Sequence, residues 1–408
     1  MKKYVLIGGS IACLGAIEGI KSVDNDADIT VICGEKTPLY SRPLISYRLE
    51  GKTTETNLFF HGKDFYQQKG VKVVDAKATK IDVKAKTVDI EDGKSLSYDK
   101  LFVGTGSYPF VPPMNGLESV KDKTCFYTLE DEEKLASLLN EKTKLLVIGA
   151  GLIGLKCAEG AYAHTKHITI VDLASRVLPN ATTPVVAAML EEKLKDMGIK
   201  VILGASVEEF FDKKATLTNG DNVDFDVVVL AIGVRPQLGL LKDAGAEINR
   251  GVIVNEKMQT SLPDVYCAGD CAEGYDAVTG QKRLLQLFPS AYNGGKTAGK
   301  NMAGKEDTFT TDCALNSTSL FGLKFTSCGS YEGNVTELTT KDGYKAFYVK
   351  DGSLIGYMLV GDTKKAGIYT NIISKKIPLS TVSDLLFDEP SLGIFDEKTR
   401  KNYLANRV

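Results

Sequence analysis

The chain has 408 residues, of which 43% are hydrophobic and 25% are charged, and its formal net charge is −2. This length allows two or three domains, and the composition is ordinary for a soluble globular protein. The near-neutral charge gives no reason to expect nucleic acid or an anionic membrane as a partner, and no apolar run approaches the roughly 20 residues of a membrane span.

The eight cysteines are scattered, and none forms a C-x-x-C pair. Cys267 and Cys271 lie on either side of a Gly-Asp pair, which is a poor match to a zinc site. The N-terminus runs from Met-Lys-Lys directly into an expected strand, without the pattern of a signal peptide. The sequence therefore predicts a cytoplasmic protein with reduced, buried thiols and no metal site.

A strand, a small-residue turn and a helix are expected at the N-terminus. The apolar residues 4–7 precede Gly8-Gly9-Ser10-Ile11-Ala12-Cys13, and a helical pattern follows. This turn departs from G-x-G-x-x-G at Ser10 and Cys13, but both residues are small, so a phosphate can still approach the backbone. Glu35 follows the next expected strand, residues 29–33, and is a candidate for the acid that binds a ribose.

The next segments connect this unit to a second one. Arg42-Pro43 either opens a helix, with proline in its first turn, or places Arg42 against a flavin or a phosphate. Residues 71–105 alternate between apolar and polar, which indicates an antiparallel insertion. A short strand then leads to Thr105 and Gly106, and the prolines that follow mark a linker.

A complete G-x-G-x-x-G lies between two expected strands, residues 145–148 and 168–171. Gly149 permits the tight turn, Gly151 lets the backbone approach a pyrophosphate, and Gly154 lets helix and strand pack closely. Asp172 ends the second strand at the spacing expected for the ribose-binding acid. It should favour NADH, although Arg176 could accommodate the 2′-phosphate of NADPH.

An acid and a helix follow in the last third of the chain. Asp270 comes directly after a short expected strand, where open α/β sheets bind ligands, and it could equally cap a helix. Residues 291–304 have a helical pattern. From residue 309 onward, alternating stretches followed by helical ones predict a separate α/β domain without a cofactor.

The order of GGSIAC, YSRPLIS, YDKLFVGTGSYPFVPP, VIGAGLIG, DVVVLAIGVRP, DVYCAGDCAE and AYNGGKTAGKNMAG resembles the FAD-dependent pyridine nucleotide-disulfide oxidoreductase superfamily. The branch it resembles most contains NADH:rubredoxin reductases and the flavin domains of nitrite reductases. This resemblance implies an α/β fold with two Rossmann-like dinucleotide-binding domains, in which the NAD domain is nested within the FAD domain. Residues 1–112 and 248–308 would hold FAD, residues 113–247 would hold NADH, and residues 309–408 would form a C-terminal α/β interface domain that could join a homodimer.

The resemblance also assigns roles to individual residues. Gly8, Ser10, Glu35, Arg42, Thr105 and Gly106 would contact FAD. Asp270 would accept a hydrogen bond from a hydroxyl of the FAD ribityl chain. The N-terminus of the helix at residues 291–304 would point at the pyrimidine side of the flavin.

The redox centre departs from the family in two ways. There is no C-x₄-C pair in the first FAD segment and no thiol near Ser46, which argues against thiol chemistry. Relatives often have a lysine after this serine, paired with a glutamate on the helix of the NAD domain, but here these positions are Tyr47 and Lys156. Our hypothesis is that Lys156 supplies the cation near the flavin N5, opposite Tyr47, where it would favour the reduced flavin. The alternative is that Lys156 is an ordinary surface lysine of an amphipathic helix.

These observations predict an enzyme that passes electrons from NADH through FAD to a separate carrier, such as rubredoxin or ferredoxin. One alternative is an NADH oxidase that reduces oxygen or peroxide at the flavin. Another is a flavin-bound subunit that senses NADH and changes its contacts with a partner. Acceptor recognition is a property of the surface, so the sequence does not choose between acceptors.

Overall fold

The computed structural model describes residues 2–37, 39–276, 278–309, 313–341 and 343–382. The contacts within the chain divide it into two compact units. One consists of Met1–Val177, Leu194–Gly274 and Lys282–Thr310, and the other of Leu178–Lys193, Tyr275–Gln281 and Thr311–Val408. The predicted boundaries at residues 112, 247 and 308 stay predictions.

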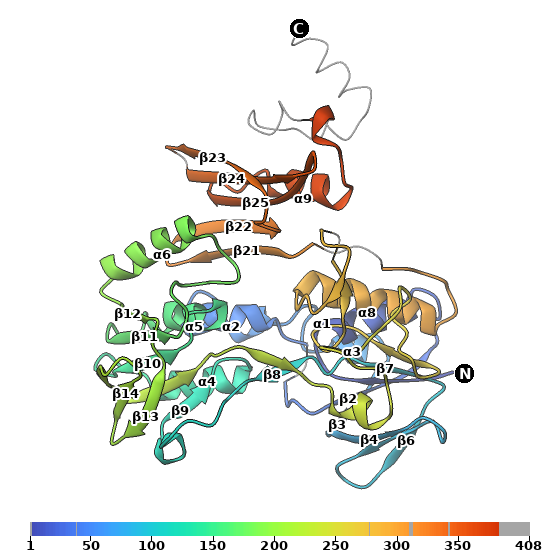
Figure 1. Cartoon of the computed structure of the whole chain (residues 1–408). Coiled ribbons are helices and arrows are strands. Elements are labelled where there is room, and N and C mark those ends of the chain that lie inside the picture. The colour runs from blue at the N-terminus through green and yellow to red at the C-terminus, as the bar shows by residue number, and fades with distance from the viewer. Residues whose placement is uncertain (1, 38, 277, 310–312, 342, 383–408) are drawn as a thin grey trace. The chain divides into compact units, whose positions relative to one another are not determined.

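The first parallel sheet has the strand order β18-β7-β1-β2-β3. Its five strands are β1 (Lys3–Ile7), β2 (Asp28–Cys33), β3 (Lys72–Asp75), β7 (Lys100–Val103) and β18 (Val265–Cys267). The central strands are nearly continuous apolar runs, as expected for a parallel sheet that is covered on both faces. The helices α1 (Ile11–Lys21) and α8 (Phe288–Met302) lie side by side (Figure 1) and pack closely.

The second parallel sheet has the order β12-β11-β10-β16-β9, in which β12-β11-β10-β16 corresponds to β3-β2-β1-β7 and the edge strand β9 precedes the others in the chain. Its strands are β9 (Lys123–Cys125), β10 (Leu145–Ile148), β11 (Ile168–Asp172), β12 (Lys200–Leu203) and β16 (Val227–Leu230). Its helices are α4 (Leu129–Leu138) and α5 (Leu152–Ala161), whereas α6 (Pro184–Asp196) belongs for the most part to the smaller unit. The two chain crossings between the sheets, β8 (Ser107–Pro109) and β17 (Val234–Pro236), pair antiparallel. The prediction of two Rossmann-like units is thus confirmed.

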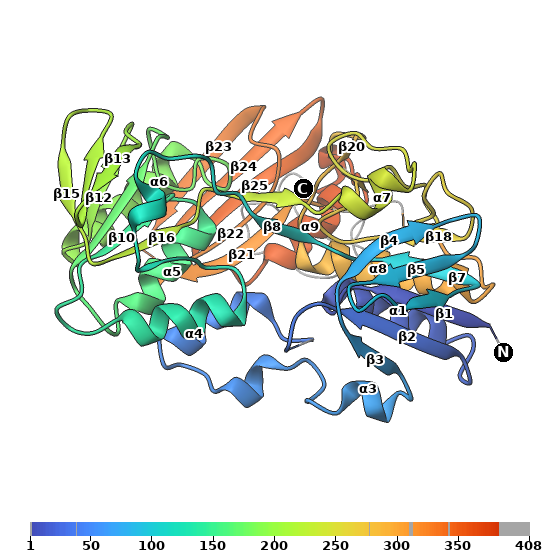
Figure 2. The same ribbon diagram turned by 90° about the horizontal axis from the view of Figure 1, so that it is seen from below.

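Two small antiparallel sheets flank the parallel ones. One contains β4 (Ala78–Asp82), β5 (Thr87–Ile90) and β6 (Ser95–Ser97). The other, yellow-green in Figure 2, contains β13 (Val207–Phe211), β14 (Lys214–Leu217) and β15 (Asn222–Asp224). The prediction that residues 71–105 are wholly antiparallel is wrong at both ends, because β3 and β7 pair parallel with β2 and β1. Alternation marks a half-buried strand but does not fix the direction of its partner.

The smaller unit is built on an antiparallel sheet with the order β21-β22-β25-β24-β23. These strands are β21 (Leu315–Leu320), β22 (Leu323–Gly329), β23 (Asn334–Thr340), β24 (Gly343–Lys350) and β25 (Ser353–Gly361), and α9 (Ala366–Ser374) packs on them. The shorter elements of the chain are α2 (Ile45–Leu49), α3 (Phe65–Gln68), α7 (Gly239–Asp243), β19 (Gly274–Tyr275) and β20 (Lys282–Arg283). In the described part of the chain, no helix combines the length and apolarity needed to cross a bilayer.

Asp264, before β18, offers a test of pH dependence. Its carboxylate lies 2.6 Å from Lys100 Nζ and 2.5 Å from Lys86 Nζ, and these contacts hold the pKa of Asp264 below its usual range. A depressed folded pKa stabilises the fold above the unfolded value, about 3.9, and this contribution is lost as the pH falls through the folded value. Asp264→Asn should therefore lower the free energy of unfolding by about 1 kcal/mol or less at neutral pH.

The difference between the wild type and Asp264→Asn should shrink as the pH falls below about 4. Asparagine suits the left-handed backbone at this position, where φ is 63°, so the substitution tests the charge rather than the turn. Denaturant unfolding at several pH values measures the effect. A difference that does not change with pH would contradict the assignment.

Candidate cofactor site

The glycine-rich turn after β10 has the geometry predicted for it. Gly149 has φ of +114°, and a Cβ there would collide with the carbonyl oxygen of Ala231. A Cβ on Gly154 would collide with the carbonyl oxygen of Gly149, whereas a Cβ on Gly151 would meet no described atom within 4 Å. Packing therefore requires two of the three glycines. The third exposes bare backbone at the N-terminus of α5, where a diphosphate can approach.

Asp172 lies over this turn at the end of β11. Its Oδ2 accepts a hydrogen bond of 2.5 Å from the backbone N–H of Ala150, and its Oδ1 accepts one of 2.7 Å from Ala174. Three exposed apolar residues stand at the same edge of the sheet: Leu152, Leu173 and Ile232. Leu173 is 71% exposed, which is unusual for a leucine beside a buried strand. A carboxylate held beside open apolar side chains suits the ribose and rings of a nucleotide.

The turn after β1 has the same form despite its altered sequence. Gly8 has φ of +119°, and a Cβ there would collide with the carbonyl oxygen of Gly104. Ser10 is the N-cap of α1, but its hydroxyl makes no capping hydrogen bond. Cys13 is fully buried, and a Cβ on Gly104 would lie 3.2 Å from its sulfur. Cysteine is thus tolerated in place of the third glycine because Gly104 leaves room for it.

Glu35 and Arg42 pair with each other. Arg42 forms an ion pair with Glu35, and Glu35 also accepts a hydrogen bond of 3.2 Å from the Tyr40 hydroxyl. The Arg42 guanidinium donates to the carbonyl oxygen of Tyr127 at 3.1 Å and lies over the Tyr127 ring, 4.6 Å from its centroid. The structure therefore brings together two predicted FAD contacts that stand seven residues apart. The helix α2 begins after them, at Ile45.

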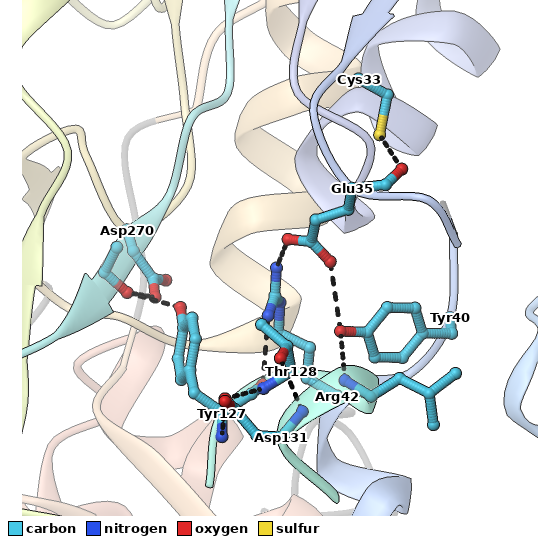
Figure 3. Close-up of polar contacts among 10 residues, drawn as sticks. Cys33, Glu35, Tyr40, Arg42, Tyr127, Thr128, Asp131 and Asp270 are labelled. Atoms are coloured by element: carbon cyan, nitrogen blue, oxygen red, sulfur yellow. Dashed lines mark hydrogen bonds and ion pairs between the residues drawn. The ribbon is translucent and has the colours of Figure 1, made fainter. Parts of the chain in front are cut away.

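Tyr127 and Ser107 are site residues that sequence reasoning missed. Figure 3 shows Tyr127 between Arg42 and Asp270. The Ser107 hydroxyl lies 2.7 Å from the Tyr127 hydroxyl and donates to Asp270 Oδ2 at 2.7 Å. Burial raises the pKa of Asp270, while the Ser107 hydrogen bond and the Arg42 charge oppose this rise. The available signal was the capping box of Thr128 and Asp131, which fixes the start of α4 and with it the place of Tyr127.

Thr105 and Gly106 join the two chain crossings. The Thr105 hydroxyl donates to the carbonyl oxygen of Gln237 at 2.9 Å, and the N–H of Gln237 donates to Gly106 at 2.9 Å. Gly106 has φ of +68°, which favours glycine. These residues hold β8 against β17 close to Asp270, and their predicted contact with FAD stays a prediction.

Tyr47 and Lys156 meet, as the hypothesis requires. Lys156 Nζ lies 3.5 Å from the Tyr47 hydroxyl and 4.6 Å from the centroid of its ring. The alternative of an ordinary surface lysine fits poorly, because only 13% of the Lys156 side chain is exposed. The sequence did not predict that Lys156 also contacts Glu159.

All eight cysteines carry thiols rather than disulfides, and seven of them are buried. The sulfur atoms of Cys267 and Cys271 lie 3.5 Å apart beside the end of β18. Among the residues that the structure describes, no three histidine, cysteine or acidic side chains are grouped so that they could hold a metal ion.

The site residues fit two dinucleotides. The N-caps of α1 and α5, Ser10 and Gly151, make no side-chain capping bond, so the first-turn N–H groups stay available for phosphate oxygens. The N-cap of α8, Leu287, likewise makes none. In the first turn of α8 the Ser290 hydroxyl is buried, and it has no hydrogen-bond partner among the described residues. Buried polar groups are normally satisfied, so this hydroxyl suits a ligand that carries polar ring atoms.

Comparison with known proteins agrees with this geometry. A family model described as pyridine nucleotide-disulphide oxidoreductase matches residues 2–295. The chain belongs to this family. An NADH oxidase of Methanocaldococcus jannaschii is 32% identical over 89% of this chain and 88% of its own. The epsilon subunit of the NADH-dependent phenylglyoxylate dehydrogenase of Aromatoleum evansii is 30% identical over 95% of both.

The NADH-rubredoxin oxidoreductase of Clostridium acetobutylicum is 26% identical over 94% of this chain and 97% of its own. The solved structure of that protein, 23% identical in this comparison, matches the fold with a TM-score of 0.75 over 97% of this chain and 98% of that one. Family membership confirms the predictions of an NAD(P)H-dependent flavin oxidoreductase with FAD and NADH as cofactors. The roles of individual residues stay predictions.

Proposed function

We propose that this chain passes electrons from NADH through FAD to a separate small redox carrier, such as rubredoxin or ferredoxin, without a redox-active cysteine of its own. The observation that carries the proposal is Ser46, which stands where the resemblance places the redox cysteine of some relatives. Here Ser46 is buried, and its hydroxyl donates to the carbonyl oxygen of Pro43 at 3.2 Å. The near full-length match to a rubredoxin-reducing relative supports the choice of carrier.

The residues of the chain would hold and orient the two cofactors. When bound, FAD supplies the conversion of a hydride into single electrons. Asp172 would accept hydrogen bonds from the ribose hydroxyls of NADH, and the N–H groups at Gly151 would bind its diphosphate. Asp270 would accept a hydrogen bond from the ribityl chain, held in place by Ser107. Lys156 would bring its charge to the flavin beside Tyr47.

Anaerobic stopped-flow mixing with NADH, followed by rubredoxin, ferredoxin or oxygen, tests the proposal. We expect flavin absorbance to bleach rapidly and to return rapidly with one carrier protein, and slowly with oxygen. Absence of bleaching would overturn the assignment of the cofactor site. Reoxidation that is slow with every carrier would overturn the proposed acceptor class.

The thiols of Cys267 and Cys271, whose sulfur atoms lie 3.5 Å apart, provide a direct test of electron transfer without a redox-active cysteine. The double variant Cys267→Ser and Cys271→Ser should retain carrier reduction within about threefold, because the proposal gives these thiols no role. Loss of carrier reduction while the flavin still bleaches with NADH would show that the thiols take part.

Two other functions have specific support. The relative named an NADH oxidase favours reduction of oxygen, for which fast reoxidation by oxygen alone would be the evidence. The relative named as a dehydrogenase subunit favours a component of a larger assembly. In that case NADH would reduce the flavin rapidly, while turnover would be slow with every isolated acceptor.

A further inference from the structure

Lys156 is paired along its own helix as well as with Tyr47. Its Nζ lies 2.7 Å from Glu159 Oε2, one turn further along α5. The side chains of Lys156 and Glu159 are 13% and 10% exposed. At this burial salt screens the two charges only weakly, so removal of either partner would leave the charge of the other acting on its surroundings. The ammonium that faces Tyr47 therefore has the Glu159 carboxylate directly beside it.

The packing of α2 on α5 fixes where this pair lies. A Cβ on Gly160 would lie 2.8 Å from the carbonyl oxygen of Ser46, so only glycine allows the two helices to approach this closely. The ring nitrogen Nε2 of His164 lies 2.6 Å from the carbonyl oxygen of Leu49. In the same short helix, Arg48 forms an ion pair with the buried Glu132 of α4. Tyr47 is thus held between well-anchored neighbours.

We infer that Glu159 is a positioning residue that holds the Lys156 ammonium against Tyr47 and offsets its positive charge. The inference rests on the proposed role of Lys156 at the flavin. Reduction adds negative charge to a flavin, so a nearby uncompensated cation favours reduction and an uncompensated anion opposes it. Removing either partner should therefore shift the flavin midpoint potential, and the two shifts should have opposite signs.

The test compares Glu159→Gln, Lys156→Met and the double variant by measuring the midpoint potential of the bound flavin against reference dyes. Glu159→Gln should raise the potential and Lys156→Met should lower it. Each should change the ratio of reduced to oxidised flavin about tenfold, which is about 30 mV for a two-electron couple. The double variant should return close to the wild type, and Lys156→Arg should retain the wild-type value.

Lys300 and Asp307 provide a matched control, because they form an ion pair of 2.8 Å near the far end of α8. Lys300→Met and Asp307→Asn should leave the potential unchanged. Shifts of the same sign in both single variants at the site, or no shift in either, would overturn the inference, since lost packing has no reason to reverse sign. Opposite shifts in a protein that reduces no carrier would support Glu159 and overturn only the proposed function.

Discussion

Replacing Gly295 by valine is expected to destabilise the larger unit by about 3 kcal/mol or more. A Cβ on Gly295 would collide with the carbonyl oxygen of Ala12 in α1. Three other glycines make equivalent contacts between α1 and α8: Gly15, Gly19 and Gly299. The two helices touch through their backbones, so relief of the collision requires one helix to move away from the parallel sheet that both of them help to cover.

Thermal and denaturant unfolding of the protein with its flavin measure this effect, with Gly239→Ala as the matched control. A Cβ on Gly239 would meet no described atom within 4 Å, and we expect that variant to stay within about 0.5 kcal/mol of the wild type. If Gly295→Val unfolded at the same denaturant concentration as the control, the close approach of α1 and α8 would be wrong.

The two parallel sheets could be predicted because their signals are local and redundant. Each turn lies between a continuous apolar strand and a helix. Gly154 is required by a contact with Gly149 in the same turn, and Gly149 by a contact with Ala231 at the end of the paired strand β16. The direction of β3 could not be read in the same way. This strand is short and largely exposed, and its parallel direction follows from its pairing with β2, which its own residues do not indicate.

The positions of Asp172 and Asp270 at the ends of buried strands could be predicted because a motif sets the residue type at a fixed spacing, whereas their contacts with the cofactors stay predictions. Contacts between side chains from distant segments could not be predicted in this way. Tyr127 follows β9 of the second sheet, and it meets Arg42 and Ser107 from other segments of the chain. No spacing in the sequence encodes these contacts. The pairing of Tyr47 with Lys156 was foreseen only because both depart from the family pattern, and Glu159 carried no signal of its own.

Replacing Asp172 by alanine is expected to reverse or abolish the preference for NADH over NADPH. The ribose hydroxyls would lose the carboxylate that accepts their hydrogen bonds. Hydrogen bonds to charged groups contribute about 1.5–3 kcal/mol, which is equivalent to about a tenfold to hundredfold loss in kcat/KM for NADH. NADPH should lose less, because the repulsion of its 2′-phosphate by Asp172 disappears as well. Adding Leu173→Arg should raise kcat/KM for NADPH further, since the exposed Leu173 stands next to that acid.

Asp172→Asn separates charge from geometry in this prediction. Its amide oxygen can still accept the N–H of Ala150, which Asp172 Oδ2 accepts at 2.5 Å, so the glycine-rich turn should keep its shape. Its NH2 group cannot accept the N–H of Ala174, so this bond is lost together with the negative charge. The asparagine variant should therefore gain activity with NADPH and lose less activity with NADH than the alanine variant. Flavin content should stay at the wild-type level in all three variants, because Asp172 follows the second glycine-rich turn and not the first. An unchanged ratio of kcat/KM for the two nucleotides in Asp172→Ala would mean that this carboxylate serves the turn alone and does not contact the ribose.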